Sequence, residues 1–172
     1  MKKILLSVLI ITLASCASTR NMPLSGEALT QVQGQSLTVV ERESPAFVAM
    51  TSGKGMFAVA GVGAAVAAGN KLVEENSIED PAKSIGAALA TQLHKQHGLH
   101  FAGVSASVAK SDKLSAISQL AGNSKYALDV ATNGWSYMYD GFNFSDYYVG
   151  YSAKIRLIDV VNGKVVSSGM CI

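Results

Sequence analysis

The chain has 172 residues, of which 14 are Lys or Arg and 12 are Asp or Glu. Lys2 and Lys3 lie in a segment that we interpret as a cleaved signal, and without them 12 basic residues face 12 acidic ones. A neutral chain without clusters of Lys and Arg has no electrostatic footprint for nucleic acid, and it is no better suited to an anionic membrane surface.

The first 16 residues have the anatomy of a bacterial lipoprotein signal. The apolar stretch 4–13 is too short to span a bilayer as a helix, and small residues follow it. The tetrapeptide Leu13-Ala14-Ser15-Cys16 resembles the lipobox, in which the cysteine thiol is acylated and the chain is cut before it. We therefore expect residues 1–15 to be a signal peptide and Cys16 to be the lipidated first residue of the mature protein. Ala17 stands where an Asp would favour the inner membrane, so we expect an outer-membrane lipid anchor with the protein facing the periplasm.

The residues after the lipidation site divide into a linker and one domain. Residues 16–34 are small and polar without a sustained period, and we interpret them as a lipidated tether. Residues 35–172 are enough for a single domain with one core. Alternating apolar and polar residues predict a strand over 36–42, and extended structure is expected again over 47–50.

A run of small apolar residues follows at 53–69 and is short for a transmembrane helix. Gly61, Ala65 and Gly69 are four residues apart, so they share one face of a helix and allow a close contact. One interpretation is a buried helix packed closely on a sheet. The other is oligomerisation or membrane insertion through these three residues.

Two helices are predicted next. Asp80 and Pro81 suit the N-cap and the first position of a helix, and Gly98 suits its end. Ser111-Asp112 predicts the cap of a shorter second helix. Strands are expected on either side of this second helix, over 99–105 and 126–131.

The strongest local signal is a hairpin near the end of the chain. Asn162-Gly163 separates two β-rich runs, 147–161 and 164–170. This pair predicts a tight turn in which both residues have positive φ.

Cysteine usage leaves one thiol unexplained. With Cys16 lipidated, Cys171 has no partner within the chain. An intermolecular partner or an unusual free thiol would explain it. A third explanation is a longer natural chain that continues past Ile172, so that the domain is truncated here.

Residues suited to catalysis or metal binding are few. His94, His97 and His100 invite a metal-binding interpretation, but we favour polar residues that complement the end of a helix. No G-x-S-x-G motif occurs, and Asp140 and Asp146 are the carboxylates that a cell-wall hydrolase would need. We predict no catalytic residue, no metal and no cofactor other than the covalent lipid.

Aromatic residues gather between positions 135 and 151, which hold eight of the 12 in the chain. Three of them alternate with other residues, so a strand would place their rings on one side. They form either cross-strand packing or a surface that binds an envelope protein or a glycan. The residues that we assign to partner binding are Trp135, Tyr137, Tyr139, Phe142 and Phe144.

Three segments carry a resemblance: DPAKSIGAALATQL (80–93), YALDVATNGWSY (126–137) and YVGYSAKIRLIDVVNGKVVSSGMC (148–171). Together they resemble proteobacterial envelope lipoproteins of unassigned function. Their order of elements is similar to the periplasmic domain of the curli-secretion lipoprotein and the amino-terminal domain of the Tol–Pal translocation protein. The resemblance implies an α/β (α+β) fold, a two-layer sandwich with helices on one face of a mixed β-sheet that ends in a C-terminal β-hairpin. It also implies binding and assembly without catalysis.

These observations predict a periplasm-facing lipoprotein with a non-enzymatic binding or assembly role in the cell envelope. The first alternative is a membrane-associated lipoprotein that forms homo-oligomers through segment 53–69. The second alternative, a cell-wall hydrolase, ranks last.

Overall fold

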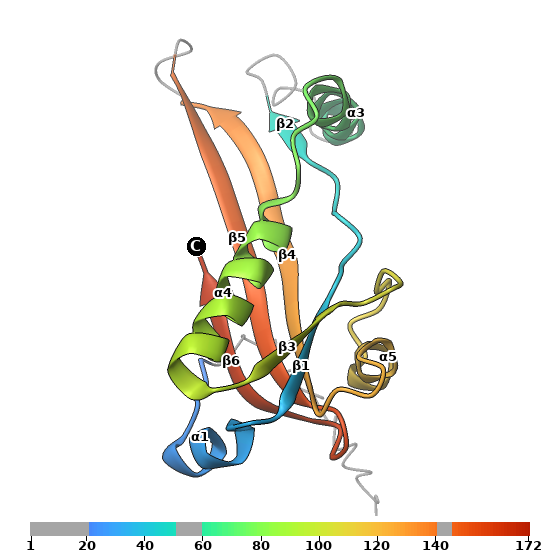
Figure 1. The fold of residues 1–172 in the computed structure, drawn as a ribbon. Coiled ribbons are helices and arrows are strands. Elements are labelled where there is room, and N and C mark those ends of the chain that lie inside the picture. The colour runs from blue at the N-terminus through green and yellow to red at the C-terminus, as the bar shows by residue number, and fades with distance from the viewer. Residues whose placement is uncertain (1–20, 51–59, 141–145) are drawn as a thin grey trace, which may run out of the picture.

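The computed structural model describes residues 21–50, 60–140 and 146–172 (Figure 1). Cys16, Phe142 and Phe144 therefore lie outside the described residues. The elements are α1 (Gly26–Val32), β1 (Ser36–Val40), β2 (Val48–Met50), α3 (Ala60–Glu75), α4 (Pro81–His97), β3 (His100–Val104), α5 (Leu114–Leu120), β4 (Tyr126–Tyr139), β5 (Tyr147–Asp159) and β6 (Lys164–Cys171). None of the helices described is both long and apolar enough to cross a membrane.

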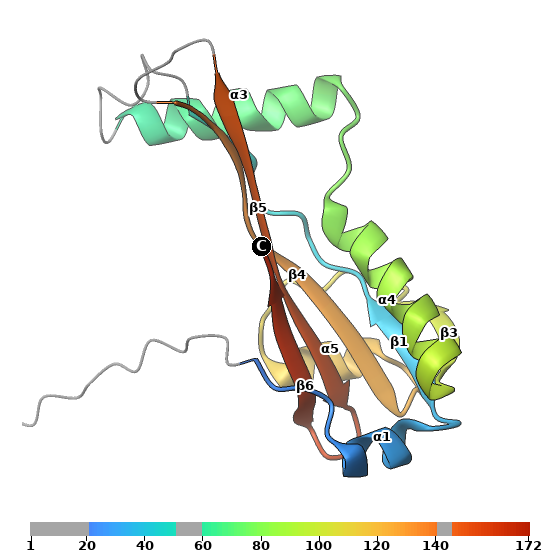
Figure 2. The same ribbon diagram turned by 90° about the vertical axis from the view of Figure 1, so that its left-hand side faces the viewer.

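One mixed sheet in the order β3-β1-β4-β5-β6 organises the chain. β1 runs parallel to both β3 and β4, whereas β4, β5 and β6 are joined antiparallel. β4 is long enough to pair with two strands on one edge, β1 along its first residues and β2 along its last. The end of β4 and the start of β5 project, together with β2, beyond β1, β3 and β6 (Figures 1 and 2).

The predicted class, a mixed α and β fold with a C-terminal hairpin, is confirmed. The placement of the helices differs in one respect, because they cover both faces (Figure 1). α1 and α4 pack on one face with Leu37 and Leu128, while Ile117 of α5 packs on the other with Val40 and Ile158. Consecutive residues of β1 and of the first half of β4 are buried, so both faces of these strands must be covered by helices.

The ends of α4 follow the prediction. The Asp80 side chain accepts a hydrogen bond from the N–H of Ala82 at 2.9 Å, and Pro81 occupies the first turn. Gly98 ends the helix in the left-handed conformation with φ of 68°. These residues fix the helix locally, since a capped start and a left-handed end satisfy its terminal groups.

α5 begins one residue later than predicted. Lys113 is its N-cap and makes no side-chain cap, whereas the Ser111 hydroxyl accepts a hydrogen bond from the Lys113 N–H. The Asp112 carboxylate is bonded to Arg42 and Lys154 instead. Ion pairs across the fold thus outcompete the local cap.

Part of the tether predicted over 16–34 is folded. Ser25 caps α1, and Val32 is fully buried in the core. Met22 exchanges two backbone hydrogen bonds with Ser168 of β6, at 2.8 and 2.9 Å. A helix of seven residues is too short to show a period in the sequence, which is why the pattern indicated a linker.

The C-terminal hairpin is confirmed, but its turn is wider than predicted. β5 ends at Asp159 and β6 begins at Lys164, and only Gly163 of the turn has positive φ. The Asp159 carboxylate accepts hydrogen bonds from both the backbone N–H and the side-chain amide of Asn162. Asn162 is therefore held by Asp159 and is unavailable for a two-residue turn.

A buried carboxylate anchors the face under α5. The Asp129 side chain is fully buried and pairs with Arg42 at 2.5 Å and Arg156 at 2.6 Å. Asp112 extends the cluster, and a hydrogen bond from Lys154 is the main reason that its pKa lies below the usual value. Asp129 thus links β4 to β5 and to the segment after β1, with its charge compensated by two guanidinium groups.

Candidate binding groove

α3 crosses the far ends of the strands instead of running along them (Figure 2). A Cβ added at Gly69 would lie 1.8 Å from the carbonyl oxygen of Phe47, so only glycine allows this approach. The side chain of the next residue, Asn70, accepts a hydrogen bond from the Phe47 N–H at 3.0 Å. Gly69 and Asn70 together dock α3 on the residue just before β2.

The small residues that share one face of α3 are buried. Gly61, Ala65 and Gly69 are all buried within the chain. Of the two interpretations of segment 53–69, the structure agrees with a helix packed closely on the sheet, at Gly69. Their burial favours the first interpretation, and oligomerisation through these three residues stays a prediction.

A β-bulge decides which side chains face α3. The β4–β5 register shifts between Thr132 and Gly134, so that Asn133 is an extra residue in β4. Before the bulge, the even-numbered residues of β4 lie opposite the odd-numbered residues of β5. After it, the odd-numbered residues of β4 take that place. Trp135, Tyr137 and Tyr139 are therefore opposite Tyr151, Val149 and Tyr147, and the two sets share one face.

These residues and α3 enclose a groove of about 400 Å³, which we call the aromatic groove. One wall is the face of β4 and β5, and the other comes from the last turns of α3 and the residues after them. The lining residues are Phe47, Leu72, Val73, Ile78, Trp135, Tyr137, Tyr139, Tyr147 and Val149.

The rings of the groove form a continuous chain of contacts. Phe47 lies edge-on to Trp135 with ring centroids 5.0 Å apart, and 6.0 Å from Tyr137. Tyr137, Tyr139 and Tyr147 follow at centroid separations of 5.8 to 6.3 Å. Such tilted and edge-to-face pairs are the favoured geometry of aromatic side chains, so the surface is preorganised.

The tyrosine hydroxyls of this surface are available to a ligand. Within the described part of the chain, no hydrogen bond engages the hydroxyl of Tyr137, Tyr139 or Tyr147. The lining includes no Asp, Glu, Lys, Arg or His. The groove can therefore bury apolar groups and orient them with a few hydroxyls, and it offers no charge to a ligand.

Sequence reasoning located one wall of the groove and missed the other. The predicted residues Trp135, Tyr137 and Tyr139 all line it, although Trp135 is 8% exposed and mostly supports the others. Leu72 and Val73 were missed because the small-residue run that marks the helix ends at Gly69. No signal in the sequence places the end of α3 opposite β4, since this contact is purely tertiary.

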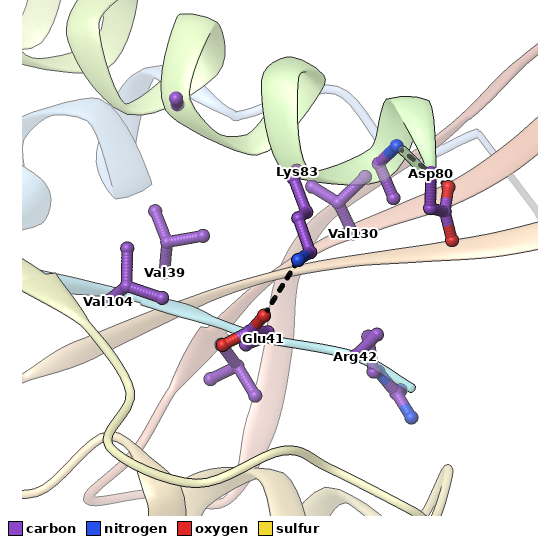
Figure 3. Close-up of a pocket in the computed structure, with 10 residues that line it drawn as sticks. Val39, Glu41, Arg42, Asp80, Lys83, Val104 and Val130 are labelled. Atoms are coloured by element: carbon purple, nitrogen blue, oxygen red, sulfur yellow. Dashed lines mark hydrogen bonds and ion pairs between the residues drawn. The ribbon is translucent and has the colours of Figure 1, made fainter. Parts of the chain in front are cut away.

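A second cavity of about 300 Å³ lies between the start of α4 and the strands β1, β3 and β4 (Figure 3). Val39, Val104 and Val130 form an apolar floor, and Lys83 reaches across to Glu41 at 3.3 Å. Figure 3 marks this ion pair with a dashed line between Lys83 and Glu41. Arg42 and Asp80 also line this cavity, and they too are bonded within the chain, to Asp129 and to the Ala82 N–H. The cavity therefore offers a ligand less than the aromatic groove does.

The remaining predicted residues have structural roles or lie at the surface. His94 contacts the backbone oxygen of Leu99 through Nδ1 at 2.7 Å, at the end of α4. The described residues contain no group of three or more His, Cys, Asp or Glu arranged for a metal. Asp140 accepts a hydrogen bond from the Tyr148 hydroxyl at 3.0 Å and lies outside the cavities described above.

Comparisons with known proteins give a likeness in fold. No protein-family model matches the sequence, and no curated protein matches it significantly. Among solved structures, the chain is similar to the PelC dodecamer from Paraburkholderia phytofirmans, at 21% identity over 89% of this chain and 76% of that one, with a TM-score of 0.38.

Two further solved structures are similar. Lipoprotein GNA1162 from Neisseria meningitidis is 19% identical over 80% of each chain, with a TM-score of 0.33. The C-terminal domain of LpoB from Escherichia coli is 17% identical over 81% of this chain and 82% of that one, with a TM-score of 0.24. At such identities and TM-scores the likeness supports no conclusion about function.

Proposed function

We propose that this protein is a lipid-anchored, periplasm-facing envelope protein with a non-enzymatic binding role, and that the aromatic groove holds an uncharged, apolar segment of a partner protein. The lipobox ending at Cys16 supports the anchor, and Ala17 in place of an Asp supports the location at the outer membrane. The observation that carries the binding role is the groove itself, which is neutral, aromatic and about 400 Å³ in volume.

The lining favours a protein segment over a glycan. Sugar hydroxyls need several directional partners, and buried polar groups without them are costly. The polar side-chain groups of the lining are tyrosine hydroxyls and the Trp135 indole N–H, which lie among apolar side chains such as Phe47 and Leu72. Aromatic and aliphatic anchors that fill such pockets are typical of protein–protein contacts.

The carboxylates support binding over catalysis. Asp129 is saturated by two arginines, and Asp80 is held by the Ala82 N–H and the Thr132 hydroxyl. Asp140 is bonded to Tyr148 on the other face of β5 from the groove. Among the residues that the structure describes, none of these three lies beside a group on which it could act as an acid or base.

A photo-crosslinking experiment in the native host tests the proposal. A benzophenone amino acid replaces Tyr139, which lines the groove, or Tyr148, which lies on the opposite face. We expect protein adducts from position 139 that are lost when Tyr137 is also changed to Ala, and weak adducts from position 148. Adducts of equal yield from both positions, or adducts with glycan or lipid alone, would contradict the proposal.

A further inference from the structure

Two of the three histidines of the chain lie side by side where α4 ends and β3 begins. The rings of His94, in the last turn of α4, and His100, the first residue of β3, have centroids 6.2 Å apart. Both residues are exposed. The end of α4 lies at the opposite end of the molecule from α3 (Figures 1 and 2). The two histidines are therefore separate from the aromatic groove.

The backbone holds both histidines in place. Gly98 ends α4 in the left-handed conformation, and its N–H donates to the carbonyl oxygen of His94 at 3.0 Å. The chain then turns directly into β3, where the His100 N–H donates to the carbonyl oxygen of Gln35 at 2.8 Å and His100 pairs with Ser36. Since the fold already brings the two rings together, a ligand that needs both of them has little ordering cost to overcome.

The hydrogen bond of His94 determines which of its ring nitrogens can bind a metal. Nδ1 lies 2.7 Å from the carbonyl oxygen of Leu99. Because a carbonyl oxygen only accepts, Nδ1 carries the proton, and in the neutral ring Nε2 keeps its lone pair. A hydrogen bond from one ring nitrogen to a backbone carbonyl is the usual support of a metal-binding histidine, since it fixes the ring and the tautomer.

The end of a helix also suits a cation. The last carbonyl groups of α4 give this end a partial negative charge. The permanently charged residue of the last turn is Lys95, which follows His94 directly and so lies about 100° away around the helix axis. The side of α4 that carries His94 is therefore open to a positive ion.

We propose that His94 and His100 together bind a divalent transition-metal ion of the zinc and copper type, with water in the remaining coordination positions. Imidazole nitrogen is a ligand that zinc, copper and nickel accept, whereas magnesium and calcium prefer oxygen. The sequence led us to expect no metal, because it does not show that β3 places His100 beside the end of α4. This inference goes beyond the binding role proposed above and does not depend on it.

The ring positions are close to those that one metal ion needs. With zinc–nitrogen bonds of about 2.0–2.1 Å and a tetrahedral angle, two imidazole centroids would be about 5 Å apart. The separation of 6.2 Å is wider by about 1 Å, which rotation of the exposed His100 ring can supply. The described residues hold no group of three or more metal-binding side chains, so we expect weaker binding than at a zinc site with three protein ligands.

Titration calorimetry of the intact protein with zinc chloride tests the site. The protein carries no affinity tag and has Cys171→Ser, which removes a free thiol that also binds zinc. The test variants are His94→Ala and His100→Ala, both at exposed positions. His97→Ala is the matched control, because its imidazole is on the same helix but lines an apolar cavity between α4 and β5.

We expect one zinc ion to bind per chain, and magnesium chloride at the same concentrations not to bind. Loss of a group that merely supports a metal ligand lowers the affinity roughly 10–100-fold, so His94→Ala and His100→Ala should each lower it at least tenfold. His97→Ala should leave it unchanged. No zinc binding by the protein before substitution, or an equal loss in all three variants, would overturn the proposal.

Nuclear magnetic resonance locates the ion directly. Copper(II) added well below one equivalent should broaden the ring signals of His94 and His100 before those of His97, because paramagnetic broadening falls steeply with distance. The folded state of each variant is read from the same spectra, so a loss of binding through unfolding is distinguished from the loss of a ligand. Broadening that begins at His97 would contradict the assignment of the site.

Discussion

Gly69 rests directly on the backbone of Phe47, with no room for a side chain between them. The Asn70 side chain accepts a hydrogen bond from the same residue, so two neighbouring positions of α3 fix the helix on β2. The width of the aromatic groove depends on this contact, because Leu72 and Val73 of the next turn form its second wall.

Gly69→Ala should therefore lift α3 and destabilise the fold by about 1–3 kcal/mol, as overpacking does. Urea unfolding followed by fluorescence of Trp135, the sole tryptophan of the chain, measures the change. Gly63→Ala is the control, since a Cβ there meets nothing within 4 Å. It should stabilise the helix by up to about 1 kcal/mol, and a loss equal to that of Gly69→Ala would refute the role of the contact.

Local chemistry explains which parts of the fold could be predicted. Asp80, Pro81 and Gly98 fix the ends of α4 by their own hydrogen bonds and backbone preferences, and the structure has them as predicted. Asn162-Gly163 also predicted the hairpin correctly. Its turn is wider because the Asp159 carboxylate captures Asn162, a contact that a dipeptide signal does not contain.

Tertiary contacts explain what could not be predicted. The alternation of Trp135, Tyr137 and Tyr139 was visible, but the bulge at Asn133 that turns them toward α3 leaves no clear mark in the sequence. The second wall of the groove depends on where α3 crosses the sheet. A glycine such as Gly69 indicates that another segment comes close, but the sequence does not show which segment it is.

Loss of the buried charge at position 129 should be strongly destabilising. Asp129→Asn leaves Arg42 and Arg156 without their carboxylate, and breaking a buried pair in this way costs about 3–5 kcal/mol. Asp112→Asn is the comparison, because its side chain is 67% exposed and such pairs contribute up to about 1 kcal/mol. Guanidinium chloride unfolding at neutral pH separates the two, and equal losses would contradict a special role of Asp129.

The hairpin turn should lose stability in acid. Burial raises the pKa of Asp159, but hydrogen bonds from Asn162 and the Lys125 ammonium outweigh it and lower the pKa below the usual value. A depressed pKa means that this contribution is complete above about pH 4, the unfolded value, and disappears as the pH falls through the folded pKa. Asp159→Asn should flatten this part of the dependence of the unfolding free energy on pH. An unchanged pH profile would show that other carboxylates cause the acid loss.

Removing α1 should expose the core, although the sequence reads as a tether there. Val32 is fully buried, and burial of one such side chain contributes about 1.5–3 kcal/mol. The two hydrogen bonds between Met22 and Ser168 would also be lost. We expect a chain that begins at residue 35 to unfold at a clearly lower urea concentration than one that begins at residue 21. Equal midpoints for the two chains would mean that α1 adds nothing to the stability of the domain.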